Sequence, residues 1–212
     1  MACGMPSITR RHVVAALGGV TAIALAWAMR LGQAQRSVSI DEAKAFIKQA
    51  GDKLVAVLSG PYGEQEKRRQ LRLLISTNVD IHGIARFAMG SSWRSATASQ
   101  REDFVRLFPT VLIECLTEAI GTYPGVSFTV GRAVENEDCI EVWTGIFIPD
   151  AAPRSVGWVV CTTADGPRIV DVVALGMSLR ITQRDYIATL VAQHGSSIEA
   201  MISALRHDIG ED

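Results

Sequence analysis

The chain has 212 residues, of which 48% are hydrophobic and 20% are charged, and its formal net charge is −1. These values fit an ordinary globular protein with a full core and exclude a mainly disordered chain. A nucleic-acid-binding surface needs a block of lysine and arginine to displace counterions from phosphates, and no such block follows Arg72. Nucleic acid is therefore excluded as a partner.

Residues 1–34 have the three parts of an export signal. Arg10 and Arg11 precede an apolar stretch at residues 13–29, and Gly32-Gln33-Ala34 offers small residues to a signal peptidase. We predict cleavage after Ala34. This removes three arginines and no acid, so the formal charge of the mature chain falls from −1 to −4. The alternative is a retained membrane anchor, but the stretch has 17 residues, fewer than the roughly 20 that span a bilayer.

The route of export stays open. The paired arginines resemble a twin-arginine export motif, but arginine pairs also occur in ordinary secretory signals.

Capping residues and apolar spacing predict three helices at the start of the mature chain. Ser39 and Glu42 form a capping box before a helix that Gly60-Pro61 ends. A second helix is expected over residues 64–76. Asp80 is expected to cap a short third helix, which Gly90 closes.

A fourth helix is predicted over residues 97–121, starting at a capping box of Thr97 and Gln100. Pro109 lies inside it, and a proline ring clashes with the carbonyl four residues earlier, so we expect a kink near Val105. Imperfect packing beside a kinked apolar helix favours a cavity there, with this helix as a candidate gate. A satisfied bend in a solid core is the alternative.

Beyond Gly125 the apolar period changes to two, which predicts four strands, at residues 126–132, 139–148, 154–163 and 168–175. Their short connections make the sheet an antiparallel meander. Two helices are expected to close the chain, at residues 182–194 and 196–206, the second with a capping box of Ser196 and Glu199. The fold class is therefore α+β, with N-terminal helices, a four-stranded antiparallel sheet and two C-terminal helices.

Three cysteines follow the leader: Cys115, Cys139 and Cys161. If the second hairpin turns at residues 150–153, Val142 lies opposite Cys161, and Cys139 then lies on the other face of the sheet. A Cys139–Cys161 disulfide is therefore disfavoured. We expect free thiols or, at most, one bridged pair.

The sequence shows no pattern typical of catalysis or of metal binding. His82, His194 and His207 are isolated, and no metal-ligand spacing occurs. Ser178 lies in a Gly-x-Ser sequence whose fifth residue is not glycine, so we interpret it as structural. No partner for Asp171 can be identified. We expect no enzyme activity, no cofactor and no metal.

Apolar and aromatic side chains are the candidates to line a cavity between helices and sheet, with a plain core as the alternative. Trp143 and Trp158 are both expected on the sheet face that the helices cover. The candidates are Phe104, Phe108, Val111, Leu112, Cys115, Trp143, Phe147, Trp158, Val160, Val172, Met177 and Tyr186.

Four blocks resemble the MlaC, or toluene-tolerance, family of periplasmic phospholipid-binding proteins. They are DIHGIARFAMG at residues 80–90, WRSAT at 93–97, QREDF at 100–104 and RIVDVVALGMSL at 168–179. The resemblance covers residues 40–205. Within the family, Thr182-Gln183-Arg184 and the twin-arginine leader are most similar to the HpnM branch, which is associated with hopanoid biosynthesis.

The resemblance implies one lipid-binding domain at residues 35–212, acting as a monomer with an apolar cavity between its helices and its sheet. It implies a periplasmic carrier of a phospholipid or hopanoid, whose partners are lipid-transport proteins of the inner and outer membranes, in outer-membrane lipid homeostasis.

Two other functions stay open. A small pocket enzyme of a cone-shaped, NTF2-like α+β fold would need Asp171 or His82 buried beside a second ionisable group. A ligand-free adaptor of a membrane transport complex would have a solid core without a cavity.

Overall fold

The computed structural model describes residues 37–120, 125–149 and 151–210, and of residues 114–120 it describes only the backbone. The predicted export signal at residues 1–34 and the predicted helix end at Gly121 lie outside the described residues. Residues 37–212 belong to a single compact unit.

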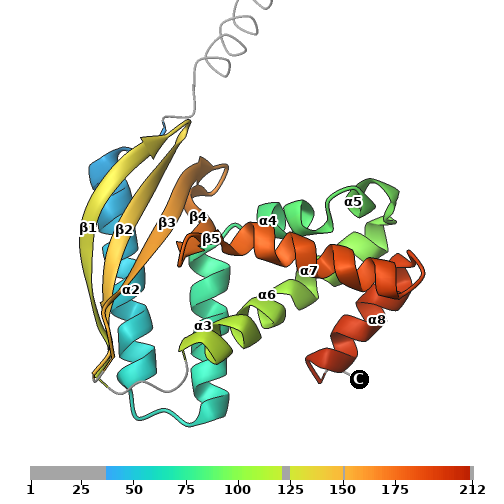
Figure 1. The fold of residues 1–212 in the computed structure, drawn as a ribbon, viewed down its shortest axis with the longest axis horizontal. Helices are drawn as coiled ribbons and strands as arrows, with labels where there is room; N and C mark the ends of the chain where they lie inside the picture. The colour runs from blue at the N-terminus through green and yellow to red at the C-terminus, as the bar shows by residue number, and fades with distance from the viewer. Residues whose placement is uncertain (1–36, 121–124, 150, 211–212) are drawn as a thin grey trace, which may run out of the picture. The chain divides into compact units, whose positions relative to one another are not determined.

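Two of the first helices, drawn in blue and green in Figure 1, begin at the predicted capping residues. Helix α2 (Ile40–Ser59) starts at Ser39, whose hydroxyl accepts from the Glu42 backbone N–H while the Glu42 carboxylate accepts from the Ser39 N–H. Helix α3 (Glu64–Asn78) follows. Helix α4 (Ile81–Met89) is capped by Asp80, and Gly90 follows its end with a φ of 55°. The predicted caps of α2 and α4 are confirmed.

Helix α6 (Ala98–Ile120) follows the short α5 (Ser92–Ser95), which the sequence did not predict. Its capping box is confirmed, because the Thr97 N–H donates to the Gln100 side chain and the Gln100 N–H donates to the Thr97 hydroxyl. The helix continues through Pro109 to its end. The kink near Val105 stays a prediction.

The last two helices start at serines that we did not predict as caps. Helix α7 (Leu179–Gln193) begins three residues before the predicted start and is capped by Ser178. Helix α8 (Ile198–Asp208) is capped by Ser197. The predicted box of Ser196 and Glu199 is wrong. Ser196 has a φ of 63°, whereas a residue that caps a helix start is typically extended.

The sheet has five antiparallel strands in chain order, not the predicted four. They are β1 (Ser127–Asn136), β2 (Cys139–Phe147), β3 (Arg154–Thr163), β4 (Gly166–Ala174) and β5 (Met177–Ser178). Strand β5 pairs with the end of β4. Two residues are too few to show a period of two, which explains why the sequence did not reveal it.

The register of β2 and β3 differs from the prediction by three positions. Their pairing ends at Ile146 opposite Arg154, so the connection between β2 and β3 is longer than the predicted turn. Pro149 and Pro153 lie in this connection and have no N–H with which to extend the ladder.

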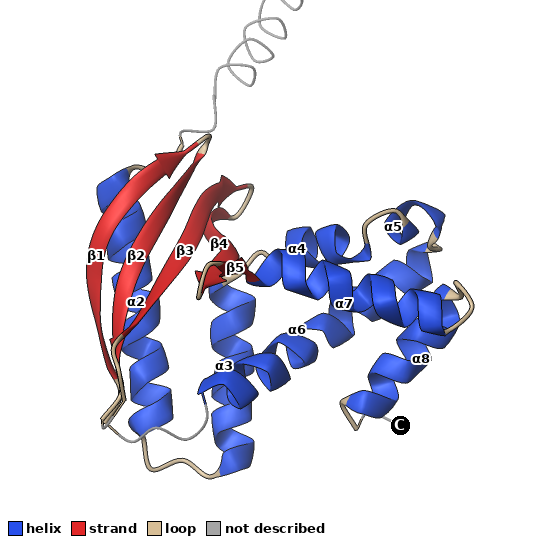
Figure 2. Ribbon diagram, in the orientation of Figure 1, coloured by secondary structure: helices blue, strands red, loops and turns tan. Residues whose placement is uncertain are grey.

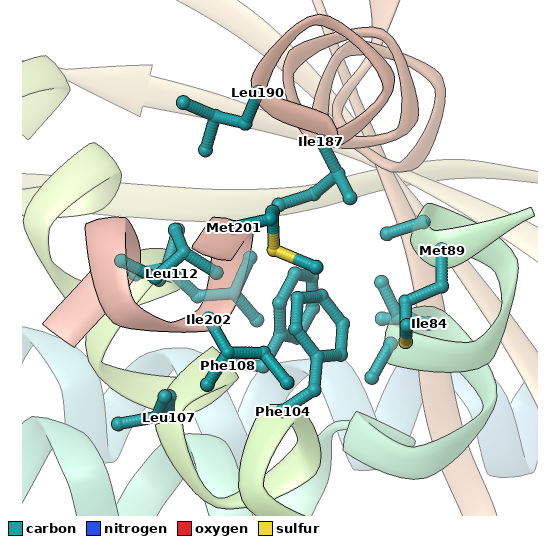
Figure 3. Packing of buried hydrophobic residues seen from close by; sticks show 14 of the residues in the cluster. Ile84, Met89, Phe104, Leu107, Phe108, Leu112, Ile187, Leu190, Met201 and Ile202 are labelled. Carbon is teal, nitrogen blue, oxygen red and sulfur yellow. The ribbon is translucent and has the colours of Figure 1, made fainter. Parts of the chain in front are cut away.

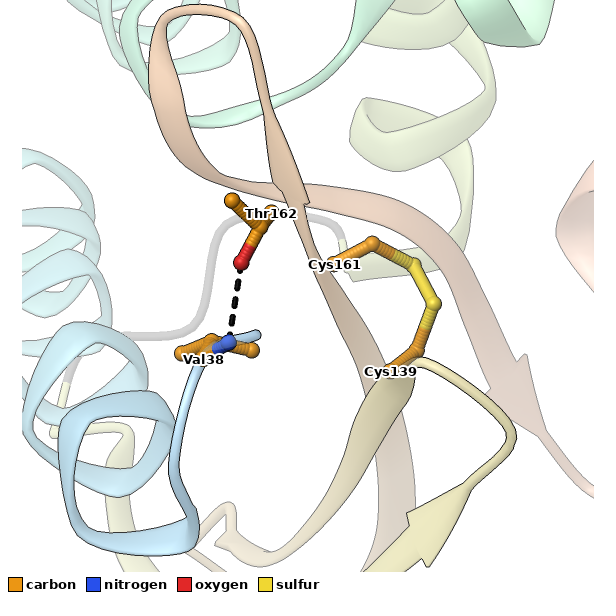
Figure 4. Close-up of a disulfide and its surroundings, with 4 residues drawn as sticks. All are labelled: Val38, Cys139, Cys161 and Thr162. Carbon is orange, nitrogen blue, oxygen red and sulfur yellow. Dashed lines mark hydrogen bonds between the residues drawn. A yellow bond between two sulfur atoms is a disulfide. The ribbon is translucent and has the colours of Figure 1, made fainter. Parts of the chain in front are cut away.

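This register brings Cys139 directly opposite Cys161, and a disulfide joins them (Figure 4). Their Cα atoms lie 4.4 Å apart, the spacing typical of a pair without mutual hydrogen bonds. The prediction that these cysteines lie on opposite faces is wrong. Next to the disulfide, the Val38 N–H donates to the Thr162 hydroxyl at 2.8 Å and ties the start of the unit to β3.

Two apolar cores hold the helices and the sheet. The helical core joins α4, α6, α7 and α8, and Figure 3 shows Phe104 and Phe108 within it, close to Ile187 and Met201. The sheet core packs the first half of α2 against the strands. Its buried members are Val38, Ala43, Ile47, Ile140, Val142, Val160 and Ile169.

In the described part of the chain, no helix combines the length and the apolar character that a membrane span requires.

Candidate functional site: an apolar pocket between two helices and the sheet

The second half of α2 contributes to a pocket instead of a closed core. Ala43 and Ile47, in the first half, are buried against the sheet. Leu54, Val55 and Leu58, in the second half, are apolar but only half-buried. They face a pocket of about 400 Å³, within the range of roughly 300–1,000 Å³ that is usual for ligand sites. Figure 2 shows α2 lying along the sheet, with α3 beside it. Residues of both helices and of the sheet line the pocket.

Apolar side chains make most of the wall. Helix α2 provides Ile47, Ala50, Leu54, Val55 and Leu58. Helix α3 provides Leu71, Leu74 and Ile75. The sheet provides Phe128, Ile146, Val156, Trp158, Ile169 and Val172. A surface of this kind favours an apolar ligand, because each Å² of apolar surface that is buried stabilises the complex by about 25 cal/mol.

Gly51 lets an aromatic ring approach the backbone of α2. A Cβ built at Gly51 would overlap the ring of Phe128, and both residues line the pocket. A glycine inside a helix costs about 1 kcal/mol relative to alanine. The close approach of the Phe128 ring explains why a glycine stands at this position of the helix.

The polar groups of Trp158, Thr144 and Asn78, which line the pocket, are satisfied by the protein itself. The Trp158 Nε1–H donates to the Thr144 hydroxyl at 2.9 Å, and that hydroxyl donates to the Val156 carbonyl at 3.2 Å. The Asn78 amide donates to the Leu74 carbonyl at 2.8 Å. These groups therefore orient the wall without requiring polar atoms from a ligand.

Asp171 joins β4 to the strand and helix that follow. It is 7% exposed. One carboxylate oxygen accepts from the Val172 and Arg180 backbone N–H groups, at 2.8 and 3.0 Å, and the other accepts from the Ser178 hydroxyl at 2.6 Å. Three donors hold this carboxylate in place, which is typical of a structural anchor. Ser178 also caps α7, in keeping with the structural role expected for it.

The alternative of a pocket enzyme requires Asp171 or His82 to be buried beside a second ionisable side chain, and neither residue forms such a pair in the described part of the chain. His82 is exposed and lies edge-on to Trp93, and Arg180 gives Asp171 only its backbone N–H. Among the side chains that the structure describes, no three His, Cys, Asp or Glu residues cluster in a way that could hold a metal ion.

Charged side chains line the pocket beside the start of α3 and the start of β3. They are Glu64, Lys67, Arg68 and Arg154, which together give a positive balance. Nearby on α3, a hydrogen bond from Arg69 lowers the pKa of Glu66 to about 2, so this carboxylate is ionised at neutral pH and Arg69 offsets its charge. This part of the pocket can accept a polar, anionic group.

Three of the predicted cavity residues line the pocket: Leu112, Trp158 and Val172. Phe104, Phe108 and Val111 are buried in the helical core instead, and Val160 is buried in the sheet core. The side chain of Cys115 lies outside the description.

Trp143 and Phe147 lie on the sheet face opposite the pocket. Val142 pairs with Trp158 and Trp143 pairs with Gly157, so the expectation that the two tryptophans share a face is wrong. The guanidinium of Arg132 lies 5.2 Å from the centre of a Trp143 ring. Met177 and Tyr186 are exposed, outside the pocket wall.

Sequence reasoning missed the contribution of α2 and α3. The apolar stripe of α2 was visible, but a stripe buried in a core and a stripe facing a pocket have the same period. The cavity was expected beside α6, whereas Leu112 is the one residue of α6 in the pocket wall among side chains described.

The sequence matches the MlaC protein family over residues 48–207, about three quarters of the chain. The chain belongs to the MlaC family. This confirms the predicted membership. No curated protein sequence matches the chain significantly.

A solved structure shares the MlaC-type fold of this chain. It is a phospholipid-binding protein from Ralstonia solanacearum, solved in complex with a phospholipid. The two chains are 18% identical and superpose with a TM-score of 0.67, and the similarity covers 80% of this chain and 97% of the other. At this identity the similarity concerns the fold.

Proposed function

We propose that this protein is an exported carrier that holds the acyl chains of a phospholipid in the pocket between α2, α3 and the sheet. The observation that carries the proposal is the apolar wall of this pocket, whose polar groups Thr144, Trp158 and Asp171 are already hydrogen-bonded within the protein. An acyl chain needs no polar partner, so such a wall suits it. Membership of the MlaC family and the phospholipid bound by the Ralstonia protein support this choice.

The lipid phosphate is proposed to lie at the charged part of the pocket. Lys67, Arg68 and Arg154 offer cationic groups there, against the single carboxylate of Glu64. Guanidinium groups bind phosphate oxygens through paired, charge-assisted hydrogen bonds. The headgroup would then stay close to water while the acyl chains are buried.

Export to the periplasm has support beyond the leader. Disulfides persist in oxidising compartments and are rare in the cytosol, so the Cys139–Cys161 disulfide favours an exported protein. Proteins of the MlaC family are periplasmic, which agrees with this setting. We propose that residues 1–34 are cleaved, and that the carrier exchanges its lipid with transport proteins of the two membranes.

Native mass spectrometry of protein purified from exporting cells, followed by extraction of the bound molecule, tests the proposal. We expect a phospholipid bound to the folded chain. A hopanoid would instead support the narrower assignment to the hopanoid-associated branch. Protein that carries no lipid and takes none up from vesicles would contradict the carrier function.

A matched pair of variants on α2 ties the bound lipid to this pocket. Ala50 lines the pocket, whereas Ala56 is exposed on the same helix. Ala50→Trp should fill the pocket and reduce the bound lipid severalfold, and Ala56→Trp should leave it unchanged. Equal lipid content in the two variants would place the ligand elsewhere.

A further inference from the structure

The turn between β4 and β5 exposes apolar side chains that the fold does not bury. Ala174 pairs with Met177, so Leu175 and Gly176 form a two-residue turn. Leu175 is 81% exposed, Met177 61% and Ile181 52%. We call these three residues the rim patch. Leu175 also lines the lipid pocket, so the rim patch lies at the edge of that pocket.

The backbone at Leu175 is strained for a leucine. Its φ is 53°, and Gly176 follows with a φ of 77°. Two-residue turns with both φ values positive favour asparagine, aspartate or glycine, because a larger side chain meets the following carbonyl. Neither the turn geometry nor core packing explains a leucine here. An observed outlier of this kind points to function.

Four arginines gather next to the rim patch. Arg86, Arg94, Arg180 and Arg184 line a shallow groove of about 490 Å³, which we call the arginine groove. The guanidinium carbons of Arg180 and Arg184 lie 4.4 and 5.2 Å from the centre of the Phe87 ring. The ring attracts both cations and holds them close together.

The arginine groove has a positive balance of charge, because Asp80 is the one carboxylate among its described lining residues. No described carboxylate forms an ion pair with any of the four arginines. Asp80 lines the groove, but it caps α4 through its contact with the Gly83 N–H. The Nε atom of Arg180 is buried and has no acceptor. Like charges held together in this way favour binding of an anion.

We infer that the rim patch and the arginine groove form one docking surface for a bilayer that contains anionic phospholipids. Arg180 lines both the lipid pocket and the groove, which makes the two continuous. The guanidinium groups bind headgroup phosphates and the apolar side chains enter the interface, a combination typical of reversible membrane binding. Three side chains are too few for the core of a stable protein interface, which buries about 800 Å² per partner.

This inference rests on the proposed function, because docking would bring the pocket to the surface from which lipid is exchanged. Its test is co-sedimentation of the protein, expressed from the full sequence, with vesicles of phosphatidylcholine alone or with added phosphatidylglycerol. The wild type should bind the anionic vesicles more tightly, and added salt should weaken that binding.

Two double variants separate the two parts of the surface without touching the lipid pocket wall. Arg86→Gln with Arg184→Gln should reduce binding to anionic vesicles by roughly fivefold per arginine. Met177→Gln with Ile181→Gln should reduce binding to both kinds of vesicle on the order of tenfold.

Arg72→Gln and Leu73→Gln are matched controls, because both side chains are exposed on α3 and lie outside the pocket and the groove. Both variants should bind vesicles like the wild type.

Equal binding of the wild type to neutral and anionic vesicles would overturn the inference, as would double variants that bind like the controls. Binding only to membranes that contain transport proteins would overturn it in favour of a protein partner. Bound lipid, measured on the same samples, keeps the two proposals apart. A protein that carries lipid but does not bind vesicles would contradict the docking surface and not the carrier function. A protein without lipid would contradict the carrier function.

Discussion

The Trp158 indole donates a hydrogen bond to the Thr144 hydroxyl at 2.9 Å, across two neighbouring strands on the pocket face of the sheet. Thr144 is 2% exposed, so its hydroxyl is shielded from water. The bond fixes the orientation of the largest ring in the pocket wall. The width of the pocket at Trp158 therefore depends on one threonine.

Replacing this threonine should destabilise the protein and release the ring. Thr144→Val keeps the volume but removes the acceptor of a partly buried N–H group, and the loss of such an acceptor costs about 1 kcal/mol or more. Urea unfolding measures the loss, and Thr129→Val, at an exposed position of β1, is the control. In a Trp158→Phe background, Thr144→Val should lower the free energy of unfolding markedly less. An equal loss in both backgrounds would show that the hydrogen bond does not contribute to stability.

Gly51 should control the space available to the ligand. Gly51→Ala removes a helix penalty of about 1 kcal/mol, but the new methyl group displaces the Phe128 ring. We expect less bound lipid with little loss of thermal stability. Adding Phe128→Leu should restore the bound lipid, because the shorter side chain leaves room for the methyl group. Gly63→Ala has open space around its Cβ and serves as the control; lipid content equal to that control would disprove the proposed clash.

Leu175 should lower the free energy of unfolding of the protein. Leu175→Asn suits the positive φ and should raise the free energy of unfolding by about 1 kcal/mol. Leu175→Ile should lower it, because a branched Cβ fits this conformation less well. Thermal unfolding of the two variants should give shifts of opposite sign. Shifts of the same sign would show that the turn is not strained at Leu175.

The disulfide should contribute to stability and leave a single free thiol. It closes a loop with a sequence separation of 22, so its removal by Cys139→Ala with Cys161→Ala should cost about 3 kcal/mol on the chain-entropy estimate. In a chain cleaved after Ala34, thiol titration under denaturing conditions should find only Cys115 before reduction and all three cysteines after it. Three thiols before reduction would contradict the disulfide.

Much of the helical framework could be predicted, because helix ends depend on residues close together in the chain. Ser39 with Glu42, Asp80 and Thr97 with Gln100 cap helices where expected. The family could also be predicted, because its motifs are runs of consecutive residues. Ser196 shows the limit of such reasoning, since the choice between two adjacent serines depends on the backbone turn at Gly195.

Only the tertiary structure decided the register of β2 and β3, and with it the disulfide and the face of Trp143. A shift of an odd number of positions turns every side chain of a strand to the other face, and the length of the connection at Pro149 and Pro153 sets that shift. It also decided that α2 and α3, rather than α6, form most of the helical wall of the pocket. An apolar helix face has the same pattern whether it meets a sheet or a ligand, because the period records the helix and not its neighbour.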